Sequence, residues 1–237
     1  MIRTAVILAG GFGTRLQPVV KDLPKPLAPV NGQPFLNYLL AYLHAFEFNS
    51  IVLSVGYLSQ KIREYYGSSY HSMKIEYSTE VAPLGTGGGV RLALEKVREQ
   101  ECLVLNGDSF FDIDLSHFYS LHVARQAHAS LALRQVEDTS RYGAVVTGKD
   151  NRVNYFREKN GLGEQGSINA GVYILNKKIF LERTPVEKNF SIEKDFFEVN
   201  LKNLEIFGFK FTDYFIDIGI PDDYTRVQND FKGFKYK

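Results

Sequence analysis

Three glycines and two cations stand close together near the start of the chain. The apolar run 4–9 ends in the glycine-rich segment 10–13, and Arg15 and Lys25 follow, with Lys25 held between two prolines. Glycine lets the backbone approach a phosphate closely, and its successive N–H groups can form a nest for an anion. Arginine and lysine add positive charges that pair with phosphate oxygens. These residue types at this spacing predict a site for a polyphosphate.

The glycine segment matches neither of two common phosphate-binding motifs. The dinucleotide fingerprint requires a third glycine at the position of Leu16, and the P-loop requires a Gly-Lys-Ser/Thr sequence that the chain lacks. A tight turn between a strand and a helix, without any ligand, is the structural alternative. The sequence therefore predicts a third kind of glycine loop.

A carboxylate follows another buried run. Asp108 stands at the end of the sequence Asn-Gly-Asp that comes directly after the apolar run 101–105. A carboxylate at the end of a strand is well placed for Mg²⁺, which typically takes one or two carboxylates together with phosphate oxygens. A cap or turn residue is the structural alternative. Asp108 is therefore a candidate metal ligand.

Two further aspartates, Asp112 and Asp114, follow at once. Asp114 precedes Leu-Ser in a pattern typical of an N-cap, which predicts a helix over 115–126. The sequence thus favours a structural function for this pair over metal binding. The single cysteine, Cys102, lies in an apolar run and is predicted to be a buried structural residue.

The candidate residues need elements that bring them to one edge of a sheet. Apolar runs at 4–9, 50–55 and 101–105 predict buried, mainly parallel strands. Helical spacing predicts helices at 35–46, at 58–66, and from the glycines at 87–89 to about residue 98. Such alternation is typical of a doubly wound α/β sheet, with ligands at the carboxyl ends of its strands. The second half predicts five strands and two helices, the strands at 129–136, 143–147, 152–158, 170–175 and 205–210, the helices at 191–200 and from Pro221.

Composition limits the classes of partner. The chain has 237 residues, of which 44% are hydrophobic and 23% charged, and its net charge is +1. These values are typical of one globular domain, and the charge gives no indication of nucleic-acid binding. No apolar run approaches the roughly 20 residues that span a bilayer, and no signal segment is recognised. We therefore expect a cytoplasmic protein without a membrane partner.

The C-terminal region is rich in aromatic side chains. We expect five of them to be exposed, where they could cover a partner in a homo-oligomer, although the oligomeric state stays open: Phe207, Phe209, Phe211, Tyr214 and Phe215.

A series of motifs now identifies a resemblance. The sequence resembles the sugar-1-phosphate nucleotidylyltransferases, whose motifs recur here in the family's order as Gly10-Gly11-Phe12-Gly13-Thr14-Arg15-Leu16, Pro24-Lys25-Pro26, Leu84-Gly85-Thr86-Gly87-Gly88, Asn106-Gly107-Asp108, Arg141-Tyr142-Gly143, Glu158-Lys159, Asn169-Ala170-Gly171 and the segment 213–219. The resemblance implies a Rossmann-like, mixed and mainly parallel sheet of the nucleotide-diphospho-sugar transferase type. It also implies a single domain, 1–237, without the C-terminal β-helix of some relatives. Residues 1–128 would mainly bind nucleotide and residues 129–237 the sugar phosphate.

The same resemblance implies the site residues. Catalysis would rest on Arg15, Lys25 and Asp108, and Mg²⁺ would be held by Asp108 and Asp217. The nucleotide-binding set would be Leu8, Gly10, Gly11, Gly13, Thr14, Arg15, Glu80, Gly85, Thr86 and Gly107. The sugar-phosphate set would be Asn106, Tyr142, Gly143, Glu158, Lys159, Asn169 and Gly171. For Tyr142, stacking on the sugar and packing in the core both stay open.

Glu80 bears on the choice of base. A carboxylate only accepts hydrogen bonds, and guanine offers two donor groups on one edge, whereas uracil and thymine offer one. Glu80 therefore favours GTP, although relatives that transfer uridylyl groups also carry a glutamate nearby. The resemblance favours D-glycero-α-D-manno-heptose 1-phosphate as the acceptor, with mannose, glucose or choline phosphate and another nucleoside triphosphate as alternatives.

The implied reaction is a single in-line displacement. A sugar-1-phosphate oxygen attacks the α-phosphorus of a nucleoside triphosphate, which gives a nucleotide sugar for surface-glycan synthesis and releases pyrophosphate. Alignment and charge neutralisation would carry catalysis, because the attacking phosphate is already ionised. A catalytically silent regulatory relative and a glycosyltransferase using Asp112 and Asp114 are the rival functions.

Overall fold

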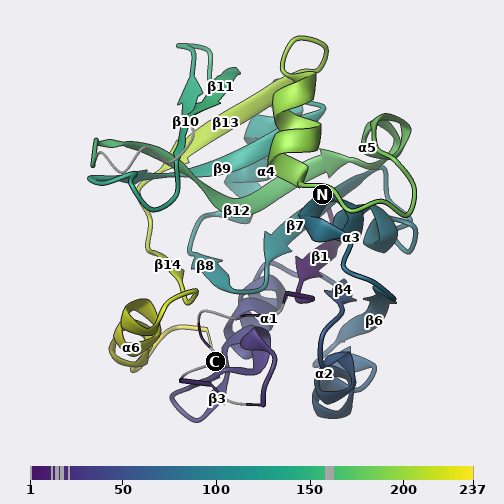
Figure 1. Ribbon diagram of the computed structural model, residues 1–237, viewed down its shortest axis with the longest axis vertical. Coiled ribbons are helices and arrows are strands. Elements are labelled where there is room, and N and C mark those ends of the chain that lie inside the picture. The colour runs from purple at the N-terminus through teal and green to yellow at the C-terminus, as the bar shows by residue number, and fades with distance from the viewer. Residues whose placement is uncertain are drawn as a thin grey trace.

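The apolar runs of the first half form the middle of a central sheet (Figure 1). The computed structural model describes residues 2–11, 13, 16, 19–20, 22–157 and 163–236. Eight strands pair in the order β13-β9-β12-β7-β1-β4-β6-β5. Their bounds are β1 Thr4–Leu8, β4 Ser50–Val55, β5 Ser69–Tyr70, β6 Met73–Thr79, β7 Glu101–Asn106, β9 Ala129–Val136, β12 Gly166–Asn176 and β13 Ile206–Phe211.

The sheet is mixed, with a parallel centre. Strand β1 pairs in parallel with both β4 and β7, and β4 pairs in parallel with β6. Strand β12 is antiparallel to β7 and β9, and thereby joins the two halves of the chain in one sheet. The expected α/β class with a mainly parallel, mixed sheet is confirmed.

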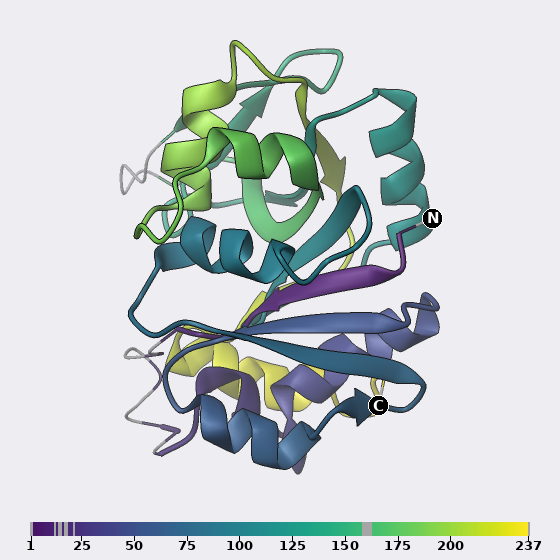
Figure 2. The ribbon, with the colours of Figure 1, turned by 90° about the vertical axis from the view of Figure 1, so that its right-hand side faces the viewer.

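Helices cover both faces because successive strand residues point to opposite sides. In β1, Ala5 and Ile7 belong to one apolar cluster and Val6 to another. Figure 2 shows α3 on one side of β1, β4 and β6, and α1, α2 and α6 on the other. The helices are α1 Phe35–Ala45, α2 Ser59–Tyr66, α3 Gly85–Leu94, α4 Leu115–Ala124, α5 Lys177–Arg183, α6 Pro221–Asp230, a 3-10 turn at Lys25–Leu27 and a π-helix at Ile192–Glu198.

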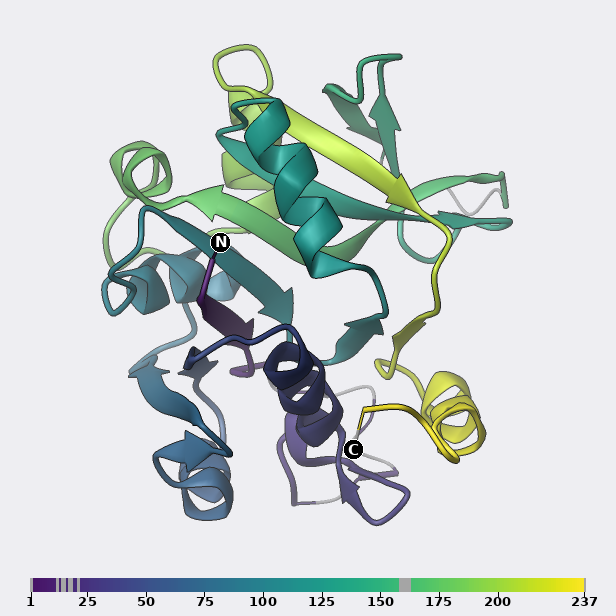
Figure 3. The same ribbon diagram turned by 180° about the vertical axis from the view of Figure 1, so that it is seen from behind.

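Short ladders lie outside the main sheet. Strand β8, Ser109–Phe111, pairs antiparallel with β14, Phe215–Asp217, which leads towards α6 (Figure 3). Strand β10, Ala144–Thr147, pairs with β11, Val153–Arg157, and β2, Pro29–Val30, pairs with β3, Gln33–Pro34. The β8–β14 ladder matters most for function, because Asp108 precedes one strand and Asp217 ends the other.

Two expectations about side chains have clear outcomes. Cys102 is fully buried, as predicted, and burial raises the pKa of its thiol. The expectation that Phe207 and Phe209 are exposed is wrong, because they are only 5% and 3% accessible and belong to the main apolar cluster. The remaining aromatics of that set, Phe211, Tyr214 and Phe215, are partly buried against the same cluster. They form no exposed aromatic patch.

Within the described ranges, no helix combines the length and apolarity that crossing a membrane requires.

Candidate active site

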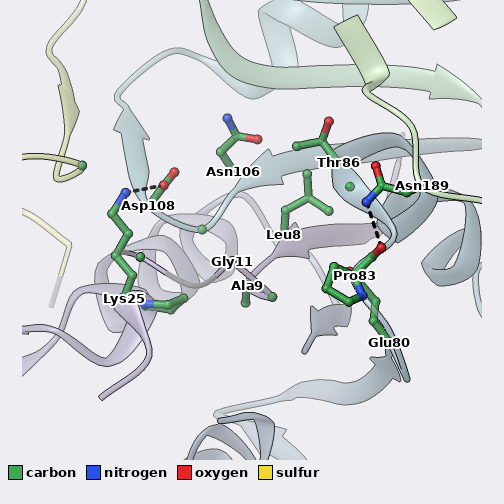
Figure 4. A pocket seen from close by; sticks show the side chains of 16 residues that line it. Leu8, Ala9, Gly11, Lys25, Glu80, Pro83, Thr86, Asn106, Asp108 and Asn189 are labelled. Carbon is green, nitrogen blue, oxygen red and sulfur yellow. Dashed lines mark hydrogen bonds and ion pairs between the residues drawn. The ribbon is translucent and has the colours of Figure 1, made fainter. Parts of the chain in front are cut away.

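A cavity of about 410 Å³ opens at the carboxyl ends of β1 and β7 (Figure 4). It brings together the predicted nucleotide and catalytic residues that the structure describes, namely Leu8, Gly10, Gly11, Gly13, Lys25, Glu80, Gly85, Thr86, Gly107 and Asp108, and one residue of the predicted sugar-phosphate set, Asn106. Thr14, Arg15, Glu158 and Lys159 lie outside the described residues. The cavity also includes five residues outside the predicted sets of site residues, Ala9, Pro26, Pro83, Asn189 and Gly219.

The glycine segment packs closely against neighbouring parts of the chain. A Cβ at Gly10 would lie 3.2 Å from the Gly56 nitrogen, so the loop runs tightly against the end of β4. Gly13 has a φ of +60°, which residues with a side chain rarely adopt. A Cβ at Gly13 would lie 3.3 Å from the Cβ of Lys25. The glycine segment therefore packs directly against Lys25.

Lys25 lies between two carboxylates. Its Nζ is 2.6 Å from Asp108 Oδ2 and 4.0 Å from Asp217 Oδ1. The 3-10 turn with a proline on each side of the lysine fixes the base of the side chain, of which only 10% is exposed. The structure thus places together three residues that stand 83 and 109 positions apart along the chain, Lys25, Asp108 and Asp217.

Backbone contacts hold the two aspartates near each other. The Gly107 N–H donates to the Leu8 carbonyl at 2.8 Å, and the Ile218 N–H donates to the Asp108 carbonyl at 2.9 Å. Asp217 accepts from the Gly219 N–H at 2.7 Å. The Asp108 and Asp217 side chains stay 39% and 24% exposed, so each can still reach a ligand.

This donor set fits a divalent cation. Two carboxylates beside a cavity offer the hard oxygen ligands that Mg²⁺ takes, with phosphate or water oxygens completing its shell. Among the described residues, no group of three or more His, Cys, Asp or Glu side chains is arranged to hold a metal. A metal held by Asp108 and Asp217 would take the rest of its ligands from phosphate or water oxygens.

Glu80 is held on the wall of the cavity. Its Oε2 accepts from the Leu84 N–H at 2.9 Å, and its Oε1 lies 3.5 Å from Ser54 Oγ. Each carboxylate oxygen has a further lone pair, so these contacts leave acceptor capacity for a ligand. The contact with the base stays a prediction.

The sugar-phosphate residues do not all line this cavity. Asn169 donates from Nδ2 to Tyr173 Oη and Glu193 Oε1, at 2.8 and 2.5 Å, and accepts from the Gly171 N–H at 3.0 Å. Gly171, with a φ of +73°, leaves room for the Asn106 side chain, which does line the cavity. Asn106 thus connects the cavity with Gly171 in β12, where the pairing with β9 shifts register between Asn169 and Tyr173.

Tyr142 packs beside Phe215, with ring centroids 6.1 Å apart, and under the guanidinium of Arg141 at 5.1 Å. Burial and the negative charge of Asp217 raise the pKa of its hydroxyl. Tyr142 and the following Gly143 are half-buried and lie outside the lining of the cavity.

Arg141 anchors the turn that carries Tyr142 to α6. Its Nη2 donates to Asp223 Oδ2 at 2.6 Å, and Arg226 approaches the other oxygen of Asp223 at 3.4 Å. The Asp223 side chain is only 8% exposed. A buried carboxylate requires such partners, so this pair ties the turn to the helix after Asp217.

Replacing Asp223 with asparagine should lower stability by about 1–2 kcal/mol, less than a fully buried pair would cost because Arg141 is half exposed. For a chain of this length that corresponds to about 2–8 °C in melting temperature, measured by calorimetry. Asp222→Asn is the matched control, because Asp222 is exposed in the same first turn of α6. Equal losses in both variants would mean that the Arg141 pair is not the cause.

The second pair of aspartates is structural, as predicted. Asp114 caps α4 by accepting from the Ser116 and His117 N–H groups at 2.8 and 2.9 Å. Asp112 pairs with Lys235 at 2.9 Å.

Comparisons with known proteins agree with this geometry. D-glycero-alpha-D-manno-heptose 1-phosphate guanylyltransferase from Aneurinibacillus thermoaerophilus is 43% identical over 230 residues, 97% of this chain and 99% of the relative. The protein of the same name from Campylobacter jejuni is 44% identical over 220 residues, 93% of this chain and 96% of the relative.

The crystal structure of HddC from Yersinia pseudotuberculosis, also solved in complex with GMP-PN, superposes with a TM-score of 0.87 at 36% identity and covers 98% of this chain and 100% of that one. The profile described as "Nucleotidyl transferase" matches residues 4–232. This match extends over nearly the whole chain and shows that the chain belongs to the nucleotidyl transferase family.

Proposed function

We propose that the chain transfers a guanylyl group from GTP to D-glycero-α-D-manno-heptose 1-phosphate and releases pyrophosphate. The observation that carries this proposal is the cluster of Lys25, Asp108 and Asp217, of which Lys25 and Asp108 line the cavity at the carboxyl ends of β1 and β7 together with the glycine loop. The acceptor and base are supported by the two guanylyltransferases that match nearly full length.

The reaction requires alignment and charge neutralisation rather than a general base. An oxygen of the sugar phosphate forms a bond to the α-phosphorus of GTP, and the bond from this phosphorus to the oxygen bridging to the β-phosphate breaks. Pyrophosphate leaves with that electron pair. The attacking oxygen is already ionised at neutral pH, so no proton has to be removed.

This chain's residues supply the positive charge and the alignment. The Lys25 ammonium would pair with phosphate oxygens in place of its present contact with Asp108, and Arg15 would bind the triphosphate. Asp108 and Asp217 would hold Mg²⁺, which neutralises phosphate charge when bound. The glycine backbone at 10–13 would cradle the triphosphate.

The sugar phosphate would lie on the side of the cavity formed by Asn106. Asn169 and Gly171, which adjoin Asn106, would position it together with Tyr142 and Gly143. Glu158 would accept hydrogen bonds from sugar hydroxyls, and Lys159 would pair with the phosphate. Residues 1–128 and 129–237 would then bind mainly nucleotide and mainly sugar phosphate, respectively.

The proposed function predicts one strong substrate pair. Pyrophosphate release should be measured with GTP, ATP, CTP and UTP against heptose, mannose and glucose 1-phosphates in the presence of Mg²⁺. We expect the fastest release with GTP and the heptose phosphate. Release with another pair would keep the reaction and replace the substrate, whereas no release with any pair would favour a choline-phosphate acceptor or a binding protein.

A further inference from the structure

Asn189 comes from the second half of the chain but lies on the wall of the cavity beside Thr86 (Figure 4). Its side-chain Nδ2 donates to the Pro83 carbonyl at 2.8 Å. Because a carbonyl only accepts, this hydrogen bond fixes which end of the amide faces Pro83. The other end, Oδ1, receives no hydrogen bond from any residue that the structure describes. An oriented acceptor is therefore presented next to the cavity.

The segment around Asn189 is held firmly against the start of α3. The Phe190 N–H donates to the Leu84 carbonyl at 3.0 Å, and the Gly87 N–H donates to the Phe190 carbonyl at 2.9 Å. The Ile192 N–H adds a bond to Thr86 Oγ1 at 3.0 Å. Side chains next to such a ladder keep their place, so the position of Asn189 does not depend on its own amide alone.

Glycines of the motif at 84–88 make this close approach possible. A Cβ at Gly85 would lie 2.6 Å from the Phe190 carbonyl oxygen and 3.1 Å from Asn189 Oδ1. A Cβ at Gly88 would lie 2.6 Å from the Lys188 carbonyl oxygen. Because these glycines have no side chains, the backbone of residues 188–190 can approach them closely. The Oδ1 atom of Asn189 therefore stays uncovered.

Two acceptors consequently flank one stretch of backbone. Glu80 binds the Leu84 N–H, and Asn189 binds the carbonyl of Pro83, the residue before it. Both residues line the cavity. A nucleotide base that contacts both side chains can form two hydrogen bonds if its edge carries two adjacent donors. A base with an acceptor at one of these positions would be repelled by the facing oxygen.

We propose that Asn189 is a specificity residue whose Oδ1 accepts a hydrogen bond from the exocyclic amine of guanine. This inference rests on the proposed function and assigns the adjacent N1–H to Glu80. Adenine and cytosine place a ring acceptor beside their amine, and uracil has a single donor between two carbonyls. Guanine alone offers an N–H and an amine side by side.

The test compares GTP with inosine triphosphate, which keeps the N1–H and the carbonyl of guanine but lacks the amine. The wild-type protein should favour GTP by about 2–10-fold in kcat/KM, the range for one neutral hydrogen bond. Asn189→Ala should lose most of this preference because GTP becomes poorer while inosine triphosphate is little affected. Affinities for the two nucleotides, measured calorimetrically without acceptor, should change in the same pattern.

Asn203→Ala is the matched control, since Asn203 is exposed and lies outside the cavity lining. It should keep the wild-type preference, and melting temperatures should verify that both variants fold. If Asn189→Ala keeps the preference for GTP over inosine triphosphate, the inference is overturned while the proposed function stands. If the wild-type protein does not favour GTP over ATP, CTP and UTP, the proposed function fails, and the inference fails with it.

Discussion

Lys25→Met is expected to lower kcat for pyrophosphate release by about 10²–10³, the effect of removing one preorganised charge contact from a phosphoryl-transfer site. Methionine keeps most of the length and apolar stem of lysine but removes the ammonium. In this protein the Lys25 ammonium lies 2.6 Å from Asp108 Oδ2, and the Lys25 side chain is only 10% exposed. Water cannot readily replace so sheltered a charge, so the loss should appear in kcat rather than only in KM.

Lys235→Met provides the control for the loss of a lysine–aspartate pair. Lys235 pairs with Asp112 at 2.9 Å, but it is 60% exposed and lies outside the cavity lining. Exposed pairs contribute little, so this variant should keep near-normal activity and stability. If Lys25→Met retains more than about one tenth of wild-type kcat, Lys25 does not carry the charge neutralisation assigned to it.

The association of Lys25 with Asp108 follows a rule that can be read from sequence. Both follow buried strands of one parallel sheet, and the carboxyl ends of such strands meet at one edge. Asp217 obeys no such rule. It is brought in by β14, a three-residue strand that pairs with the equally short β8. Strands of that length carry no reliable periodic signal, so only the family resemblance pointed to Asp217.

The glycines at 84–88 have a packing role in addition to the nucleotide contact that the sequence predicts for Gly85. The sequence interpretation assigns Gly85 to the nucleotide, and Gly85 does line the cavity. The structure adds that Gly85, Gly87 and Gly88 leave space for residues 188–190. That contact spans about a hundred positions and depends on the absence of side chains, which no local pattern reveals. Asn189 was missed for the same reason.

The prediction that Phe207 and Phe209 are exposed is wrong because it rests on their residue type and leaves out the strand that carries them. Residues 206–209 form an apolar run, and β13 stands at the edge of the main sheet, where it pairs in parallel with β9 and makes an isolated bridge from Phe207 to Arg152. Phe209 nevertheless packs on Phe118 of α4, with ring centroids 6.2 Å apart. An edge strand that is covered by a helix buries its side chains on that face. The apolar run itself was the better indicator of burial.

A second large effect is expected from Gly107→Ala, which should impair both folding and catalysis. A Cβ at Gly107 would lie 2.6 Å from the Leu8 carbonyl oxygen, which accepts the Gly107 N–H at 2.8 Å. Backbone atoms of two paired strands cannot move aside as a flexible side chain can. We expect a loss of about 1–3 kcal/mol of stability, the usual cost of overpacking a well-packed interior.

The catalytic loss in Gly107→Ala follows from its neighbours. Leu8 ends β1 just before the glycine loop, and Asp108 directly follows Gly107, so separating these two backbones shifts the proposed nucleotide and metal ligands relative to each other. A displacement of about 1 Å in an aligned site can cost about 10² in rate. Kinetics at a temperature well below the melting point would separate this loss from unfolding.

Gly11→Ala tests whether the effect comes from the close contact or from loss of glycine itself. Gly11 lies in the same cavity wall, yet a Cβ there would meet no atom within 4 Å among the described residues beyond its chain neighbours. It should therefore keep the wild-type melting temperature, whatever it does to nucleotide binding. A Gly107→Ala protein with unchanged melting temperature and kcat would show that the backbone at the end of β1 can move to accommodate the added methyl group. The separation of the glycine loop from Asp108 would then not limit the reaction.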